Sequence, residues 1–435
     1  MGSITQTVES ILGASQVTSW EALSAVWQTR VQGAIAADSP PDCIAYPNTV
    51  AQLAELVACA HQNQWRLLPC GHGSKLSWGA QVTGADLIIS TQHLNQVVEH
   101  AAGDLTVTAQ AGVGFAELQT TLLQARQFLA IDPAYPQQAT LGGIVATRDT
   151  GSQRQRYGSI RDMLIGVSFV RHDGQLAKAG GRVVKNVAGY DLMKLMSGSF
   201  GTLGILTQLT WRTFPQQETV QTVVLTGSAI AIRAVTADVL KSSLTPTKLD
   251  IVSPGLGTDE GGLFSLAVQF QSIAAGVAEQ IALLTAIAQP YELQLQTRAD
   301  ETDATFWQEL AAALLPVERT ADLGIAKVGI LPAQAVDLLE YLRSTLAPGC
   351  WRARLHASSG IGTLQLNCQQ NSPDQLAKVR LRCQTTGGYL NLLEAPSDWK
   401  QQLDSWAFNS SARLLMTRLQ KQFDPQGCLS PGRMG

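Results

Sequence analysis

Four glycine-rich clusters in the first half of the sequence limit what the chain can fold into more than any other feature. The first, Pro69–Lys75 (PCGHGSK), follows an apolar strand pattern, and its alternating glycines let the backbone turn tightly and come close to a ligand. Successive N–H groups in such a turn form a nest for an anion, to which Ser74 and Lys75 add donors, so a diphosphate fits the loop. Taken alone, this cluster fits an ordinary tight turn equally well.

Three more clusters follow at Thr140–Ala146 (TLGGIVA), Gly180–Leu192 (GGRVVKNVAGYDL) and Gly198–Ile205 (GSFGTLGI). Turns in a core rarely need so many glycines, whereas backbone that lines a long, flat ligand does. A separate motif, Gly112-Val113-Gly114, lies between a predicted strand and a predicted helix, with Asp132 further on, as in a dinucleotide-binding fingerprint. Glu117 stands where that fingerprint has its third glycine, so we do not expect a nicotinamide dinucleotide site.

The composition sets further limits. With 435 residues the chain is too long for one ordinary core, so we expect at least two domains. Its 31 basic and 34 acidic residues leave a net charge of −3, and no long basic run occurs, so nucleic-acid binding is not expected. No stretch approaches the roughly 20 apolar residues of a membrane span. The N-terminus lacks a secretory signal pattern, so we expect a cytoplasmic protein and leave membrane association through a partner open.

The cysteines narrow the chemistry. All seven are scattered, and no Cys-x-x-Cys pair occurs. Such spacing argues against a disulfide framework, an iron–sulfur cluster or a zinc site built by this chain alone. We therefore expect reduced thiols and no metal site.

Local patterns divide the chain near residue 216. Asn48 and Thr49 cap a predicted helix with apolar residues at helical spacing, and Asp173-Gly174 forms the turn of a predicted hairpin. Up to Pro215, the patterns predict helices at 20–38 and 115–124 and strands at 66–69, 87–89, 105–108, 163–171, 175–179 and 203–213. Beyond Pro215, they predict strands at 220–226, 263–270, 326–330 and 388–393 and helices at 230–240, 274–288, 333–346 and 410–422.

As a set and in their order, the clusters between Pro40 and Pro215 resemble the FAD-binding domain of the vanillyl-alcohol-oxidase family, also called the PCMH-type domain. The resemblance implies an α+β fold: a two-subdomain PCMH-type FAD-binding domain followed by an α+β cap domain with an antiparallel sheet. The implied domains are a helical N-terminal segment (1–39), the FAD-binding domain (40–216), a cap domain for substrate or partner (217–387) and a C-terminal segment that packs back on the FAD domain (388–435).

The same resemblance implies a cofactor site. The loop at Pro69–Lys75 is similar to the family's diphosphate loop, and Gly198–Ile205 is similar to its last cofactor segment. Related enzymes that join FAD covalently have a histidine where Gly73 stands, one position after His72, so we expect non-covalent FAD. The implied cofactor-binding residues are Pro69, Cys70, Gly71, His72, Gly73, Ser74, Lys75, Asp132, Pro133, Thr140, Leu141, Gly142, Gly143, Ala146, Tyr157, Arg161, Asp162, Gly204 and Ile205.

A closer resemblance, carried by Gly180–Asp191 and by the tail from Phe423 to Met434, is to the E-type FAD-binding subunit of glycolate oxidase, or glycolate dehydrogenase. It implies a heteromeric complex with a second FAD subunit and an iron–sulfur subunit. Such a complex oxidises glycolate, a small 2-hydroxy acid, to glyoxylate and passes electrons to the iron–sulfur partner.

The catalytic residues are less defined. Catalytic relatives carry a two-histidine metal motif in the second domain, whereas the matching segment LHASSGIGTL keeps only His356, a poor basis for a metal site. A substrate carboxylate requires a cationic clamp, for which arginine is suited, and the hydroxyl proton requires a base. The candidates are His356, Arg354 and Tyr190, with Arg352 and Lys185 as further possibilities. Their spacing assigns none of them, and a packed His356 is the plainer interpretation.

Two other functions stay open. One is a non-catalytic structural or electron-relay subunit, and the other is a stand-alone FAD-dependent alcohol or 2-hydroxy-acid dehydrogenase. The intact diphosphate loop argues against a vestigial FAD site. The missing metal motif and the missing covalent histidine argue against a stand-alone enzyme.

Overall fold

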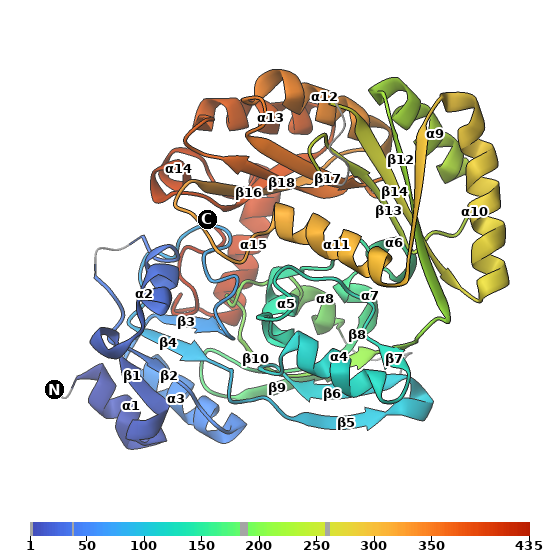
Figure 1. The fold of residues 1–435 in the computed structure, drawn as a ribbon. Coiled ribbons are helices and arrows are strands. Elements are labelled where there is room, and N and C mark those ends of the chain that lie inside the picture. Colours follow the sequence, from blue (N-terminus) through green and yellow to red (C-terminus); the bar gives the residue numbers. More distant parts are fainter. Residues whose placement is uncertain (1–2, 37–38, 183–189, 257–261) are drawn as a thin grey trace. The chain divides into compact units, whose positions relative to one another are not determined.

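The computed structural model describes residues 3–36, 39–182, 190–256 and 262–435, and its backbone divides into two compact units (Figure 1). The first unit comprises Met1–Thr150, Ser159–Gln216 and Phe408–Gly435. The second unit comprises Gly151–Gly158 and Gln217–Ala407. Within both units helices pack on sheets, which confirms the α+β class that the resemblance implied.

A four-stranded sheet forms the first half of unit 1. Its order is β1 (Val17–Ser19), β2 (Cys43–Ala45), β4 (Leu87–Ser90) and β3 (Leu67–Cys70), with β2, β4 and β3 parallel. Helix α3 (Val50–Gln62) begins where the sequence predicts it, because the Thr49 side chain accepts a hydrogen bond from the Gln52 N–H. Its residues Leu53, Leu56 and Val57 are buried in a core shared with α1 (Ile4–Leu12) and the sheet.

An antiparallel sheet forms the second half of unit 1. Its order is β5 (Val97–Ala101), β6 (Thr106–Gln110), β10 (Ile205–Arg212), β8 (Leu164–Val170) and β9 (Leu176–Gly180). The predicted hairpin around Asp173-Gly174 is confirmed as β8 and β9. Short elements complete this half: α4 (Phe115–Leu123), β7 (Gln127–Phe128), α5 (Leu141–Thr147), α7 (Ile160–Met163), α8 (Leu192–Met196) and β11 (Phe214–Pro215).

Unit 2 is built on one antiparallel sheet of eight strands. Its order is β15 (Gln294–Ala299), β12 (Thr219–Gly227), β14 (Phe264–Ser272), β13 (Lys248–Val252), β17 (Trp351–His356), β18 (Ile361–Asn367), β16 (Leu323–Gly329) and β19 (Tyr389–Glu394). Alternate residues of β12 enter different cores, because side chains alternate across a strand. Val223 and Leu225 join the larger core, whereas Val224 joins the smaller one.

Helices cover both faces of this sheet. The larger core receives side chains of α9 (Ala229–Lys241), α10 (Ala274–Ala288), α12 (Ala335–Thr345), α13 (Pro373–Thr385) and α14 (Ser397–Gln402). The smaller core receives Phe306, Trp307 and Leu310 of α11 (Asp300–Leu314). The short helix α6 (Arg154–Tyr157) also belongs to unit 2, although it lies far earlier in the sequence.

Three predictions differ from the structure. The helix predicted at 20–38 is shorter: α2 spans Ala25–Gln32, because Ser24 caps its start and Gly33 ends it. The segment predicted to leave the second domain at residue 388 instead begins with β19, whose buried Leu390 and Leu392 belong to the larger core of unit 2. The chain joins unit 1 again only at Phe408, before α15 (Ser410–Phe423). Residues 151–158, predicted within the FAD-binding domain, belong to unit 2.

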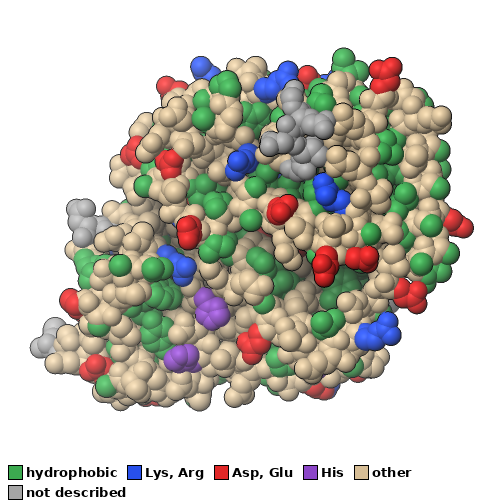
Figure 2. Space-filling model, in the orientation of Figure 1, with side chains coloured by type: hydrophobic (Ala, Val, Ile, Leu, Met, Phe, Trp, Pro, Cys, Tyr) green, Lys and Arg blue, Asp and Glu red, His purple; other side chains and the backbone are tan. Residues whose placement is uncertain are grey.

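Two surface observations bear on partners. No helix in the described part of the chain has both the length and the apolar character that crossing a membrane requires. On the face shown in Figure 2, outside the grey residues, acidic and basic side chains lie scattered among neutral atoms and form no patch of one sign. That distribution agrees with the near-balanced charge of the sequence.

Candidate functional site

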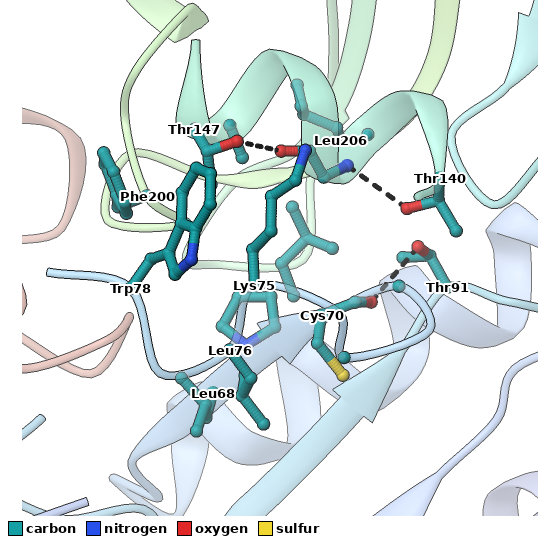
Figure 3. Close-up of a pocket in the computed structure, with 18 of the residues that line it drawn as sticks. Leu68, Cys70, Lys75, Leu76, Trp78, Thr91, Thr140, Thr147, Phe200 and Leu206 are labelled. Atoms are coloured by element: carbon teal, nitrogen blue, oxygen red, sulfur yellow. Dashed lines mark hydrogen bonds between the residues drawn. The ribbon is translucent and has the colours of Figure 1, made fainter. Parts of the chain in front are cut away.

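Residues of the first, second and fourth glycine clusters line one pocket of unit 1, which contains roughly 770 Å³ of non-protein space, part of it open to solvent (Figure 3). Gly180–Leu192, part of which lies outside the described residues, is not in this lining. The loop after β3, the start of α5 and the loop before β10 form its walls. Predicted cofactor residues in its lining are Pro69, Cys70, Gly71, His72, Gly73, Ser74, Lys75, Thr140, Gly142, Gly143, Ala146, Gly204 and Ile205. Residues far apart in the sequence thus surround one space, as a long ligand requires.

Gly71 and Gly143 have different surroundings, one closely packed and the other largely open. A Cβ atom on Gly71 would lie 2.1 Å from Thr140 Oγ1, so the loop after β3 can touch the cap of α5 only without a side chain. Thr140 Oγ1 in turn accepts a hydrogen bond from the Gly143 N–H at 3.2 Å. A Cβ on Gly143 would meet only this Thr140 oxygen, at 3.2 Å, so its remaining side is open toward the pocket.

Two cationic side chains line the pocket. Lys75, whose side chain is 4% exposed, extends toward α5, and its Nζ lies 2.6 Å from Asp149 Oδ2 (Figure 3). Arg433 is 3% exposed, and its guanidinium donates to the carbonyl oxygens of Trp78 (3.1 Å) and Ala80 (2.9 Å). Burial lowers the pKa of Arg433 to about 10, which still leaves the group charged near neutral pH.

The lining residues suit FAD. Free backbone space beside Gly143 and the positive charges of Lys75 and Arg433 fit a diphosphate. The aromatic and aliphatic side chains of Trp78 and Leu206 fit a flat ring. His72 is held at its ring by a 3.3 Å contact between Nδ1 and the Gln138 carbonyl oxygen. Non-covalent binding therefore remains our expectation for this site.

Several lining residues were missed from the sequence. Phe200, with a left-handed backbone (φ 51°), belongs to the Gly198–Ile205 cluster that was predicted to lie against the cofactor, although it was not among the named cofactor residues. Trp78 follows Lys75 closely in the same loop, but Arg433 comes from the other end of the chain. The missed residues are Leu68, Leu76, Trp78, Thr91, Thr147, Ser199, Phe200, Gly201, Leu206 and Arg433.

Other predicted cofactor residues do not line this pocket. Asp132 supports the second loop, where its N–H donates to the Thr150 carbonyl oxygen at 3.0 Å. Asp162 caps α7 through Ser159, and although burial acts to raise its pKa, these hydrogen bonds lower it. Tyr157 belongs to unit 2, where its hydroxyl contacts Gln271 Oε1 at 3.5 Å. The predicted residues outside the lining are Asp132, Pro133, Leu141, Tyr157, Arg161 and Asp162.

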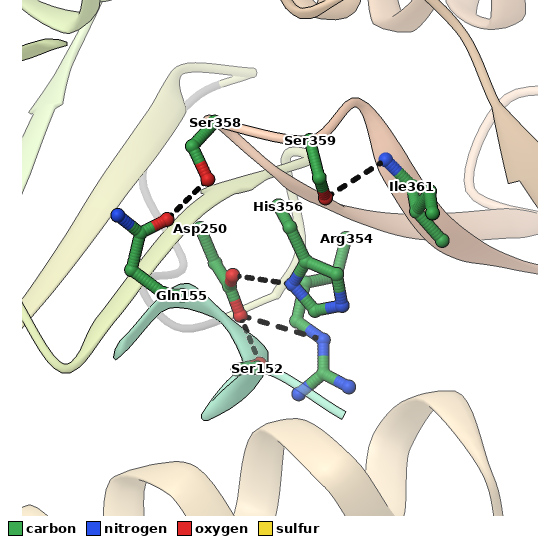
Figure 4. A network of polar contacts seen from close by, with 8 residues as sticks. All are labelled: Ser152, Gln155, Asp250, Arg354, His356, Ser358, Ser359 and Ile361. Atoms are coloured by element: carbon green, nitrogen blue, oxygen red, sulfur yellow. Dashed lines mark hydrogen bonds and ion pairs between the residues drawn. The ribbon is translucent and has the colours of Figure 1, made fainter. Parts of the chain in front are cut away.

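A second cluster of polar residues lies within unit 2 (Figure 4). Asp250 on β13 is fully buried and stands opposite His356 on β17, with Asp250 Oδ1 2.7 Å from His356 Nδ1. Arg354 Nε lies 3.7 Å from Asp250 Oδ2, and Ser152 Oγ donates to the same carboxylate. The cluster therefore places one carboxylate among a histidine, an arginine and a hydroxyl.

Charge explains how Asp250 stays ionised in the core. Burial alone would raise its pKa, but the interactions with His356 and Arg354, together with the Ser152 hydrogen bond, lower the pKa below its usual value. Asp250 was not among the residues predicted from the sequence. Its signal was an acidic residue inside the otherwise apolar end of a strand, Leu249–Val252.

The other catalytic candidates that the structure describes, Tyr190 and Arg352, are exposed. Tyr190 is 93% exposed and belongs to unit 1. Arg352 is exposed, and its guanidinium contacts the Ala313 carbonyl oxygen at 3.5 Å. Lys185 and the rest of the segment 183–189 lie outside the described residues. In the described part of the chain, no three His, Cys, Asp or Glu side chains are grouped as ligands of a metal ion.

Comparison with known proteins supports the cofactor. A family model described as an FAD binding domain matches residues 41–180. Among solved structures, p-cresol methylhydroxylase with bound substrate has a TM-score of 0.77 at 14% identity, covering 99% of this chain and 96% of that one. A likeness at this identity establishes the fold.

Curated relatives are similar along different shares of the chain. Glycolate oxidase subunit GlcD of Bacillus subtilis is 25% identical over 426 residues, 91% of this chain and 89% of that protein. D-lactate dehydrogenase of Anaerostipes hadrus is 24% identical, covering 93% and 92%. Glycolate oxidase subunit GlcE of Escherichia coli is 36% identical, but only over 165 residues, 38% of this chain and 47% of that protein. The similarity to GlcE thus covers less than half of either protein and does not single out that type of subunit.

The match at residues 41–180 includes the loop after β3 and helix α5, which line the pocket in unit 1. The chain therefore has the PCMH-type FAD-binding fold, binds FAD, and is similar to a glycolate oxidase subunit and a D-lactate dehydrogenase.

Proposed function

We propose that the chain is an FAD-dependent oxidoreductase of small 2-hydroxy acids, with glycolate as its substrate and glyoxylate as its product. Two relatives with similarity along nearly the whole chain are named for glycolate and D-lactate, which are both 2-hydroxy acids. The observation that carries the proposal is the buried set Asp250, His356 and Arg354, because a 2-hydroxy acid requires both a base and a cation.

Each residue of the set has a defined role in the proposal. FAD supplies the acceptor for the hydride that leaves the substrate carbon. His356 accepts the hydroxyl proton at Nε2, because its Nδ1 donates to the Asp250 carboxylate. The Arg354 guanidinium binds the substrate carboxylate. The substrate thus loses a hydride and a proton and becomes a 2-oxo acid.

Asp250 is a positioning residue in this scheme. Its carboxylate holds the His356 ring in one tautomer and stabilises the charge that the ring gains with the proton. Ser152 and Arg354 keep Asp250 ionised. Asp250→Asn should therefore shift the pH profile of substrate oxidation, which a purely structural residue would not do.

We also propose that electrons leave through a partner. The seven cysteines, all in the described part of the chain, are free thiols, and none forms a Cys-x-x-Cys pair. An iron–sulfur cluster would therefore be supplied by another subunit, beside a second FAD subunit, as in the complex that the resemblance to the E-type subunit implies. Assignment as that subunit, a cytoplasmic location and membrane association through partners belong to the same proposal.

The test is the visible spectrum of the purified chain before and after anaerobic glycolate or D-lactate, alone and with its partner subunits. We expect bound flavin that bleaches with a 2-hydroxy acid. Bound flavin that no 2-hydroxy acid bleaches, even with partners present, would refute the proposal and favour an electron-relay subunit. A chain without flavin after reconstitution would favour a structural subunit.

Variants then locate the chemistry. Arg354→Lys should raise the glycolate concentration for half-maximal bleaching about 10-fold or more, because lysine cannot bind a carboxylate bidentately. Arg352→Lys is the matched control, since Arg352 lies on the same strand but is exposed. His356→Asn should slow bleaching roughly 100-fold at unchanged FAD content, which is a usual effect of losing a general base. Equal effects of the two lysine variants would contradict the role of Arg354.

A further inference from the structure

The C-terminal tail that follows α15 pairs with the strand that leads into the glycine loop. Leu67 N–H, at the start of β3, donates to the Cys428 carbonyl oxygen at 2.8 Å. Ser430 N–H donates back to the Leu67 carbonyl oxygen at 2.8 Å, and Leu429 forms an isolated parallel bridge with Leu67. The tail is therefore held along the edge of β3 as an added extended segment.

Turns on either side hold the tail in this position. The Asp424 carboxylate accepts hydrogen bonds from Gly427 N–H (3.1 Å) and Leu429 N–H (2.6 Å). Gly432 has a left-handed backbone (φ 79°), and a Cβ there would lie 2.7 Å from Thr83 Cγ2, so the tail passes close to this loop. These contacts determine where the next residue, Arg433, points.

Arg433 is one of the residues that line the FAD pocket. Its side chain is almost fully buried, and two carbonyl oxygens, of Trp78 and Ala80, hold its guanidinium. A carbonyl oxygen orients a guanidinium but does not cancel its positive charge. An anionic ligand in this pocket would lie among residues that include this guanidinium-bearing side chain.

FAD offers an anion of this kind. Its diphosphate is negatively charged near neutral pH in both oxidation states of the flavin, and the ring gains negative charge when it is reduced. A guanidinium forms strong, charge-assisted hydrogen bonds with either group.

We propose that Arg433 is a cofactor-binding residue, and that the C-terminal tail delivers this positive charge to the FAD site. The proposal rests on FAD binding by the chain and adds its last residues to that site. Cofactor affinity, flavin potential or both then depend on Arg433. This residue lies more than 350 positions after the diphosphate loop in the sequence, yet it contacts Trp78 just beyond that loop.

The test compares Arg433→Met and Arg433→Lys with Arg418→Met. Arg418 is an exposed residue of α15, so its substitution removes the same charge from the same end of the chain without touching the pocket. Each apoprotein is titrated with FAD by flavin fluorescence, its melting temperature is measured without FAD, and the midpoint potential is measured after FAD saturation.

If Arg433 binds the diphosphate, Arg433→Met should weaken FAD binding roughly 10- to 100-fold, the loss typical of a charge-assisted hydrogen bond. If Arg433 faces the ring, Arg433→Met should keep the wild-type affinity for oxidised FAD. A 10-fold loss of affinity for the reduced form alone would lower the midpoint potential by about 30 mV. Arg433→Lys should restore part of either effect, and it serves as the test variant if Arg433→Met does not fold. Affinity and potential both equal to those of Arg418→Met would overturn the proposal, whereas a wild-type chain that fails to bind FAD would overturn the cofactor assignment instead.

Discussion

Two alanine substitutions in the FAD pocket should have different effects. Gly71→Ala should mainly destabilise the protein, whereas Gly143→Ala should mainly weaken FAD binding. A Cβ at residue 71 would lie 2.1 Å from Thr140 Oγ1, 2.8 Å from its Cγ2 and 2.9 Å from its Cβ. Thr140 is 2% exposed and caps α5, so it has little room to move away. Gly71→Ala therefore forces an overpacked contact between two loops.

The structure gives the size of each effect. Overpacking costs about 1–3 kcal/mol, and displacing the Thr140 cap costs about 1 kcal/mol more. The free energy of unfolding should thus fall by about 2–4 kcal/mol in Gly71→Ala. Gly143 lies in α5, where alanine gains up to about 1 kcal/mol in helix propensity. Its added Cβ would meet only Thr140 Oγ1, at 3.2 Å. The free energy of unfolding of Gly143→Ala should therefore lie within about 1 kcal/mol of the wild-type value.

Cofactor binding should separate the two positions. The Gly143→Ala methyl group would enter pocket space, so a folded variant should bind FAD at least about 10-fold more weakly. Urea unfolding of the apoproteins measures stability, and fluorescence titration measures FAD affinity. Wild-type stability in Gly71→Ala would refute the loop contact with Thr140. Wild-type FAD affinity in Gly143→Ala would refute the place of α5 in the cofactor site.

Three further predictions concern the same two regions. Asp250→Asn should cost about 3–5 kcal/mol at neutral pH, because it leaves the positive charge of Arg354 without its buried partner and weakens the contact with His356 Nδ1. Because the folded-state pKa of Asp250 lies below its unfolded value of 3.8, its stabilisation is present above that value and is lost as the pH falls through the folded pKa. Wild-type unfolding measured from about pH 6 to about pH 2 should therefore show an acid-induced loss that is smaller in Asp250→Asn, and equal losses would contradict this. Thr140→Ala should lower the free energy of urea unfolding by about 1 kcal/mol through loss of the α5 cap, and an unchanged midpoint would argue against the cap. Burial raises the pKa of Cys70 to about 12, so iodoacetamide at about pH 8 should label it far more slowly in the native than in the denatured chain, as peptide mapping would detect.

Local elements were largely predictable because their causes are local. Helix α3 follows from its Thr49 cap and its apolar spacing, and the β8–β9 hairpin follows from the Asp173-Gly174 turn. The prediction for residues 20–38 was too long, since apolar content continues past the points where Ser24 and Gly33 begin and end the helix. A cap acts through a single hydrogen bond, and composition does not reveal which candidate makes it.

The cofactor pocket was predictable for a different reason. Close backbone approach demands glycine, and this demand appears in the sequence wherever the fold places it, as at Gly71 beside Thr140. The glycine clusters therefore indicate the FAD site at the level of the sequence. A position that lines the pocket with its side chain can be filled by many residue types. Such positions, Trp78 and Phe200 among them, were therefore not named from the sequence.

The sequence by itself thus determined the elements, the division near residue 216 and the loops that approach the cofactor. Only the tertiary structure decided which distant residues meet. Asp250 and His356 become partners through the register of β13 and β17, and Arg433 reaches the pocket because the tail pairs with β3. Strand register and edge pairing depend on the packing of the whole sheet, and no period or cap within a short segment encodes them.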